Sequence, residues 1–157
     1  MPGIDECLLE AMRLPGARGA ALVDWTSGLA LGTVGESPGG DHEATATEAA
    51  ELARLAAEHR CFTSAAAPDT RHHRDDPHDP HPPQLAGHTD PDTPDDPADP
   101  PLEDLIISNR DSYHVLRFVG STFDSSIVLH LWLARTEGNL ALARIRLGEM
   151  AGRLVLG

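Results

Sequence analysis

The side chains best suited to hold a metal ion are concentrated in residues 65–101. Nine aspartates there are interleaved with five histidines, which are His72, His73, His78, His81 and His88. Imidazole and carboxylate groups are ligands of zinc and nickel. The same stretch is rich in proline and has almost no apolar side chains to bury, so we expect it to be disordered. A segment without a set geometry predicts weak metal binding at most, and no cofactor.

The other reactive side chains do not form a recognisable catalytic group. Cys61 and His59 are the only nucleophile and base close in sequence, and residues two apart on a helix point away from each other. His130 lies in the middle of a predicted strand with Trp132 on the same face, which is more typical of packing than of catalysis. The chain contains no lysine, which excludes a phosphate-binding P-loop and Schiff-base chemistry. We therefore expect a protein that is not an enzyme.

All twelve basic residues are arginines, and an exposed, mobile arginine can act as an arginine finger on a transferred phosphate. Arg60, at the end of a predicted helix, and Arg110, in a predicted turn, meet this description. Solvated surface arginines are the simpler interpretation of both. The bias toward arginine and alanine without lysine is typical of proteins from GC-rich genomes, such as those of actinobacteria.

Charge and hydropathy narrow the class of protein further. The chain has 157 residues and a formal net charge of −13, and more than half of that charge lies in residues 65–101. The remainder is only mildly acidic, which argues against nucleic acid and anionic membranes as partners. No apolar stretch is long enough to cross a membrane, and the N-terminus lacks the features of a signal peptide. Because two cysteines make no disulfide framework, we expect a cytoplasmic protein.

Residues 65–101 interrupt what otherwise reads as one small domain. Together residues 1–64 and 102–157 amount to about 120 residues, enough for one hydrophobic core. We predict that these are the N-terminal and C-terminal halves of the same domain, joined by a disordered insertion rich in Asp, Pro and His. A connection of about forty residues in place of about five costs roughly 2 kcal/mol of closure entropy, so the insertion need not prevent folding.

Hydrophobic periodicity in the two halves predicts three helices and five strands. The helices are expected at residues 4–12, 42–60 and 139–154, and the strands at 17–25, 29–35, 104–108, 113–120 and 127–133. Asp41 is a suitable cap for the central helix, and Glu149 can pair with Arg153 one turn further on. The order α-β-β-α-β-β-β-α predicts an α+β fold in which a five-stranded antiparallel sheet has helices on both faces.

Four segments in these elements resemble the roadblock (dynein light chain) family. Two of the segments resemble the opening hairpin of that family. They are Leu14-Pro-Gly-Ala-Arg-Gly-Ala-Ala-Leu-Val-Asp24 and Ser27-Gly-Leu-Ala-Leu31. The strand after its central helix is resembled by Leu102-Glu-Asp-Leu-Ile-Ile-Ser108, and the start of its closing helix by Asn139-Leu-Ala-Leu-Ala-Arg144. The resemblance covers the chain outside the insertion and implies a profilin-like sheet.

The resemblance also implies a homodimer. In such dimers the central helices pack about a twofold axis, and the strand after that helix joins the two sheets. Carried over residue by residue, the dimer interface contains Ala49, Leu52, Ala53, Ala56, Leu105, Ile106, Ile107 and Ser108. The apolar character of residues 105–107 agrees with this, because such a strand is an aggregation liability at an uncovered sheet edge. Pairing across a twofold axis would cover it.

Bacterial members of the roadblock family act as non-enzymatic partners of small Ras-like GTPases. Some stimulate GTP hydrolysis, and others belong to protein sets that include a sensor kinase. The resemblance thus implies a dimeric adaptor that binds and regulates a small Ras-like GTPase in a bacterial signalling system. The alternative is a ligand-sensing or scaffolding module whose insertion responds to metal ions or to pH, because histidines titrate near neutrality.

Overall fold

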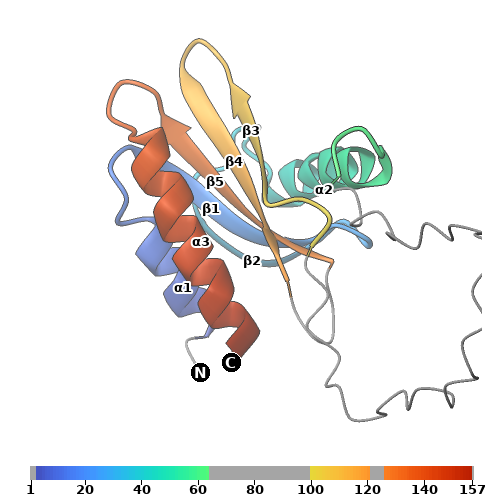
Figure 1. Cartoon of the computed structure of the whole chain (residues 1–157). Coiled ribbons are helices and arrows are strands. Elements are labelled where there is room, and N and C mark those ends of the chain that lie inside the picture. Colours follow the sequence, from blue (N-terminus) through green and yellow to red (C-terminus); the bar gives the residue numbers. More distant parts are fainter. Residues whose placement is uncertain (1–2, 64–99, 121–125, 157) are drawn as a thin grey trace, which may run out of the picture.

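A computed structural model describes residues 3–63, 100–120 and 126–156 of the chain. It contains one antiparallel sheet of five strands with helices on both faces (Figure 1), and the predicted order α-β-β-α-β-β-β-α is confirmed. Only Pro100 and Pro101 of the predicted insertion belong to the described residues. The disorder expected between residues 65 and 99, and the five histidines there, lie outside them and stay predictions.

The elements follow the sequence-based expectations to within one or two residues at most ends. They are α1 (Ile4–Ala11), β1 (Ala17–Asp24), β2 (Leu29–Gly35), α2 (His42–Glu58), β3 (Asp104–Ser108), β4 (Ser112–Val119), β5 (Ile127–Ala134) and α3 (Leu140–Leu156). The strand order across the sheet is β2-β1-β5-β4-β3. The central strand β5 lies beside β1, so neighbouring interior strands come from opposite ends of the chain, and β2 and β3 form the two edges.

The sheet separates two hydrophobic cores. Alternation along β5 sends Leu129, Leu131 and Leu133 to the face covered by α1 and α3. Val128, on the opposite face, packs with the small buried residues of α2. Because those α2 residues are all alanines, the helix lies close to the sheet.

Local hydrogen bonds explain where the chain turns between β1 and β2 and where α2 begins. In the β1–β2 turn, the Asp24 carboxylate accepts hydrogen bonds from Thr26 and Ser27, and Gly28 adopts a φ of +79°. That left-handed conformation favours glycine. At the start of α2, the Asp41 carboxylate accepts hydrogen bonds from the backbone N–H groups of the first turn, at 3.0 and 3.4 Å, which confirms the predicted cap.

One predicted contact on α3 is wrong. Glu149 does not pair with Arg153; its carboxylate lies 3.1 Å from the guanidinium of Arg146, three residues earlier. Arg153 instead forms an ion pair with Glu10 of α1. The local i,i+4 spacing allowed the first pairing, but the packing of α1 beside α3 brings another carboxylate within reach of Arg153.

Candidate functional site

The edge strand β3 is the first feature of the candidate site. Within the described residues it pairs with β4 alone, so the backbone groups on its other side have no strand partner. Leu105, Ile106 and Ile107 are each half-buried, although they belong to an edge. An apolar edge of this kind is a surface on which another strand can pair.

The outer surface of α2 supplies further apolar side chains. Leu52 is 41% exposed and Leu55 is 55% exposed. Thr45 lines a small hollow together with His130 of β5, and Leu52 follows Thr45 by two helical turns. Leu52 therefore lies on the flank of α2 that faces the centre of the sheet. The helix α2 packs mainly on β2, β1 and β5, so the side of β4 and β3 that faces α2 is less covered. We call the accessible residues on that side of the sheet and on α2 the open face; they are Leu52, Leu55, Leu105, Ile107 and His114.

The residues predicted for a dimer interface occupy two different environments. Ala49 and Ala53 are 6% and 0% exposed, because they lie on the side of α2 that packs against the chain's own sheet. Leu52 and Ala56 lie on the accessible sides of α2, and residues 105–108 form the sheet edge. The two alanines can therefore set how closely α2 approaches the sheet but do not present a surface to a partner.

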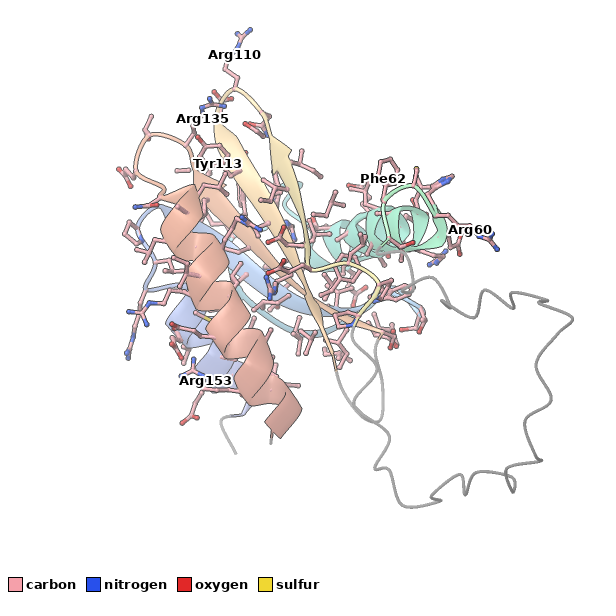
Figure 2. The ribbon with its side chains drawn as sticks, viewed as in Figure 1. Arg60, Phe62, Arg110, Tyr113, Arg135 and Arg153 are labelled. Carbon is pink, nitrogen blue, oxygen red and sulfur yellow. The ribbon has the colours of Figure 1, made fainter. Side chains whose placement is uncertain are left out.

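Two exposed apolar residues near this region did not figure in the sequence-based interface. Leu55 stands three residues after Leu52, a spacing that could have identified it as part of the same exposed stripe. Phe62, which is 63% exposed, lies just beyond the end of α2 (Figure 2). Its ring contacts the ring of His59 edge to face. No periodic pattern marks Phe62, because it follows the last helical turn.

A pair of histidines lies on the same side of the sheet. Nδ1 of His114 and Nε2 of His130 are 3.1 Å apart, close enough for one ring to donate a hydrogen bond to the other. Burial, together with the positive charge that His114 would carry, lowers the pKa of His130 to about 4. Burial likewise lowers the pKa of His114. Both rings are therefore neutral at pH 7, and the pair is a packed polar contact.

Ring stacking extends from the two histidines through Trp132 to Arg18 of β1. The rings of His114 and Trp132 are nearly parallel, with an interplanar angle of 11°. The Arg18 guanidinium lies 3.9 Å from the centroid of the Trp132 ring and is held by Glu36 at 3.1 Å. A cation over an indole face is attracted by the ring electrons. This layer joins β4, β5 and β1 and makes Trp132 a packing residue, as expected.

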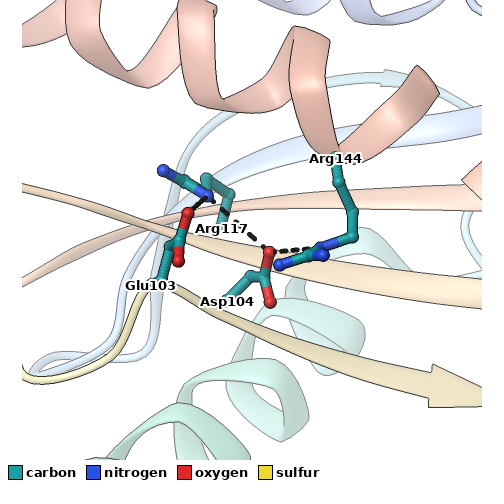
Figure 3. A network of polar contacts seen from close by, with 4 residues as sticks. All are labelled: Glu103, Asp104, Arg117 and Arg144. Atoms are coloured by element: carbon teal, nitrogen blue, oxygen red, sulfur yellow. Dashed lines mark hydrogen bonds and ion pairs between the residues drawn. The ribbon is translucent and has the colours of Figure 1, made fainter. Parts of the chain in front are cut away.

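A network of charges anchors β3 at its first residues (Figure 3). Arg117 of β4 lies 3.0 Å from the Glu103 carboxylate and 3.7 Å from that of Asp104. Arg144 of α3 donates to Asp104 at 2.8 Å, and this hydrogen bond raises the pKa of Arg144. Because Asp104 is largely buried, it ties β3 to both β4 and α3 immediately after the connection from α2.

The remaining reactive residues are dispersed. Arg60 and Arg110 are both exposed, at the end of α2 and at the β3–β4 turn respectively (Figure 2), and neither has an ion pair within the described ranges. Cys61 is exposed, whereas Cys7 is buried and its pKa is raised by burial. Among residues 3–63, 100–120 and 126–156 no three metal-ligand side chains converge.

Solved structures with this architecture identify the fold. A Roadblock/LC7 domain from Streptomyces avermitilis superposes with a TM-score of 0.59 and 13% identity, over 96% of this chain and 93% of its own. MglB in a tetrameric arrangement gives a TM-score of 0.61 and 16% identity, over 96% and 84%. MglB of Myxococcus xanthus gives 0.54 and 14%, over 93% and 80%. The chain thus has the roadblock fold.

Comparisons at the sequence level add nothing to this identification, since the sequence matches no protein-family model and no curated protein. In the described part of the chain, none of the helices combines the length and apolar character needed to cross a membrane.

Proposed function

We propose that this chain is a cytoplasmic, homodimeric adaptor that binds and regulates a small Ras-like GTPase without being an enzyme itself. The main structural support for a dimer is the open face, which includes residues of β3 and of α2. The apolar edge strand β3, which pairs only with β4 among the described residues, and the exposed leucines of α2 both belong to the side of the sheet that α2 covers. The roadblock fold supports the wider proposal, because the family resemblance implies partnership with such GTPases.

A second copy of the chain suits this surface. If β3 pairs antiparallel with β3 of the second copy, both sets of unpaired backbone groups are satisfied and the two sheets become continuous. Such pairing places the two α2 helices on the same face of the joined sheet. Leu52, on the flank of α2, then loses exposed area, and covering about half of a leucine side chain contributes roughly 1 kcal/mol.

The predicted interface residues take distinct roles in this dimer. Ile107 and Leu105 alternate in direction with Ile106 along β3, so the first two face the α2 side and the third faces α3. Ala56 lies beside Leu52 on the helix surface, while Ala49 and Ala53 hold α2 against its own sheet. One of the neighbouring structures is an MglB in tetrameric arrangement, which supports self-association of this fold.

The dimer is tested by size-exclusion chromatography with light scattering. Ile107→Asp and Leu52→Glu each place a charge in the open face and should convert a dimer to a monomer. Leu29→Glu is the matched control, because Leu29 is 65% exposed on the opposite edge strand and should leave the dimer intact. A monomeric unchanged chain, or equal effects of all three substitutions, would overturn the proposed interface.

The GTPase is tested in a separate measurement. The purified protein is mixed with the Ras-like GTPase encoded nearest to it, loaded with GDP or with a non-hydrolysable GTP analogue. A complex that forms with one nucleotide state in preference to the other supports the proposal. A dimer that ignores both states would overturn GTPase regulation and favour a scaffolding or sensing module. A sensor kinase, also implied by the resemblance, would be a further partner in the same proposal.

A further inference from the structure

A series of hydrogen-bonded side chains leads from the β3–β4 turn to the interior of the sheet. Oδ1 of Asn109 accepts hydrogen bonds from the backbone N–H of Asp111, at 2.9 Å, and from the backbone N–H and the hydroxyl of Ser112, at 2.8 and 3.0 Å. The Ser112 hydroxyl also lies 3.4 Å from Nε2 of His114, whose Nδ1 lies 3.1 Å from Nε2 of His130. The series therefore joins an exposed turn to a histidine that is only 6% exposed.

The directions of these hydrogen bonds determine where the ring hydrogens lie. The Ser112 hydroxyl gives its only hydrogen to Asn109, so toward His114 it can only accept. Nε2 of His114 therefore carries a hydrogen, and Nδ1 of the neutral ring carries none. The bond between the two rings is accordingly donated by Nε2 of His130. A second hydrogen on His114 would sit on Nδ1 and face this donor, so the bond survives only if the hydrogen of His130 moves to its own Nδ1.

His114 lies next to the proposed dimer joint. It stands directly opposite Ile107 in the register of β3 and β4, and side chains in such a pair have Cβ atoms about 5 Å apart. Because β3 is the edge strand, it alone separates His114 from a second copy that pairs at that edge. Residues 105–107 are apolar, so this part of β3 brings no charge to the joint. A partner that covers Ile107 therefore also covers the ring of His114, which is half-buried in the single chain.

The surroundings of His114 do little to compensate a positive charge on its ring. Within the described ranges no carboxylate pairs with it, and burial lowers its pKa. Arg18 of β1 is itself positive and already pairs with Glu36 of β2. From α2, His42 lines the hollow beside the histidine pair, and Glu48 is exposed to solvent. Protonation of His114 therefore leaves a charge that is tolerated only while part of the ring reaches water.

We propose that the dimer is stable only while His114 is neutral, so that acidification through the range in which histidines titrate separates the two copies. Covering the ring favours its neutral form, so association is strongest above the unperturbed pKa of 6.5 and weakens as the pH falls below that value. Each dimer contains this residue twice, which doubles the effect. The inference rests on the proposed dimer and adds a condition under which the adaptor assembles.

The direct test is the dissociation constant of the dimer, measured by sedimentation equilibrium at about pH 7.5 and about pH 5.5 with the ionic strength held constant. His130 remains largely neutral at the lower pH because its pKa is about 4, and circular dichroism checks that the fold persists. We expect the dissociation constant to rise at least about tenfold at the lower pH. A dimer with equal constants at both pH values would overturn the control by pH alone. A chain that is monomeric at the higher pH would overturn the proposed dimer as well.

Substitutions assign the response to one side chain. His114→Gln keeps a group that can accept from His130 and donate to Ser112 but cannot become charged, so its two constants should differ less than about twofold. His114→Phe keeps a ring to stack on Trp132 and should behave in the same way, which covers the case in which the glutamine variant does not fold. His42→Gln, at the start of α2, is the matched control and should keep the response of the unchanged chain. A response that persists without His114, or that disappears in His42→Gln, would overturn the proposal.

Discussion

His114 and His130 share a hydrogen bond that needs one ring nitrogen without a proton, so the contact depends on pH. His130 is buried and His114 is half-buried, and the ring of His114 stacks on the rings of His130 and Trp132. The charged groups nearest this stack are the Arg18 guanidinium over Trp132 and the Glu36 carboxylate paired with it. His42 of α2 lines the same hollow as His130. A proton on His130 would therefore be buried, with another imidazole beside it.

We expect the free energy of unfolding to fall as the pH drops. The pKa of His130 is about 4 in the folded chain and 6.5 when unperturbed, so the unfolded state takes up the proton first. Stability is full above about pH 6.5 and declines as pH falls toward 4. His130 should account for about 2 kcal/mol between pH 7 and pH 5. Urea unfolding at these two values measures the loss.

Two variants separate this contribution from other titrating groups. His130→Met removes the buried imidazole and should flatten the dependence on pH, even if the variant is less stable at pH 7. His59→Gln, at the exposed end of α2, should keep the slope of the unchanged chain. If His130→Met retained that slope, the histidine pair would not be its source.

Arg60 is an exposed arginine just beyond the end of α2, and it provides a test of the arginine-finger hypothesis. We expect Arg60→Ala to change GTP hydrolysis by a bound Ras-like GTPase less than about twofold, because a solvated surface arginine makes no contact with phosphate. Removing a true finger would lower the rate about a thousandfold or more. Single-turnover release of phosphate distinguishes the two, with the GTPase alone as the reference rate.

At the scale of single elements, ion pairs add to the strand pairing that holds β3 in place. It is short and lies at an edge, and the connection from α2 leads directly into it. Arg117 and Arg144 hold its first residue, Asp104, from β4 and from α3. The arginines differ in exposure, at 18% for the side chain of Arg117 and 46% for that of Arg144. Charge pairs screened from solvent contribute more than exposed ones.

Hydrogen exchange should reveal this difference. We expect Arg117→Ala to speed exchange of the β3 backbone amides roughly tenfold, since most disruptive single substitutions cost about 1–2 kcal/mol. Arg144→Ala should have a smaller effect on the same amides. Amides of β1 and β5, in the centre of the sheet, serve as the internal reference. A larger effect of Arg144→Ala would contradict the ranking by exposure.

The helices and strands themselves were largely predictable. Periodic apolar residues, the Asp41 cap and the turn around Gly28 are local signals that lie within a few residues of the structure they specify. The edge position of β3 was predicted together with its apolar character. Exposure of Leu55 and Phe62 was not, because it depends on which side of α2 meets the sheet and on where the chain goes after the helix.

At the scale of the whole molecule, the folded domain and residues 65–99 raise separate questions. The described residues form one sheet with two cores, and both halves of the chain contribute strands to its centre. The sequence predicts that the intervening segment adds an entropic cost of loop closure and negative charge, and takes no part in the core. Its five histidines also form the basis of the alternative function as a module that responds to metal ions or pH.

Deleting residues 66–100 tests both ideas together. We expect the shortened chain to keep its circular dichroism spectrum and dimeric state, and to gain about 1 kcal/mol in unfolding free energy, because the loop shortens by about two doublings. Binding to the Ras-like GTPase should persist. Loss of that binding with the fold intact would place the function in the deleted segment and support the sensing alternative.

Local patterns were enough to specify the order, type and approximate bounds of the elements, because each of these depends on neighbours within one or two turns. The place of β3 at an edge of the sheet came from the family resemblance, since strand order is not a local property. Which distant residues meet depends instead on how the helices pack on the sheet. Examples are His114 with His130 and Arg153 with Glu10. Such contacts join residues up to 143 positions apart, and they form when the two cores pack on the sheet. No local pattern records that packing, so the mistaken pairing of Glu149 with Arg153 could be corrected only from the folded chain.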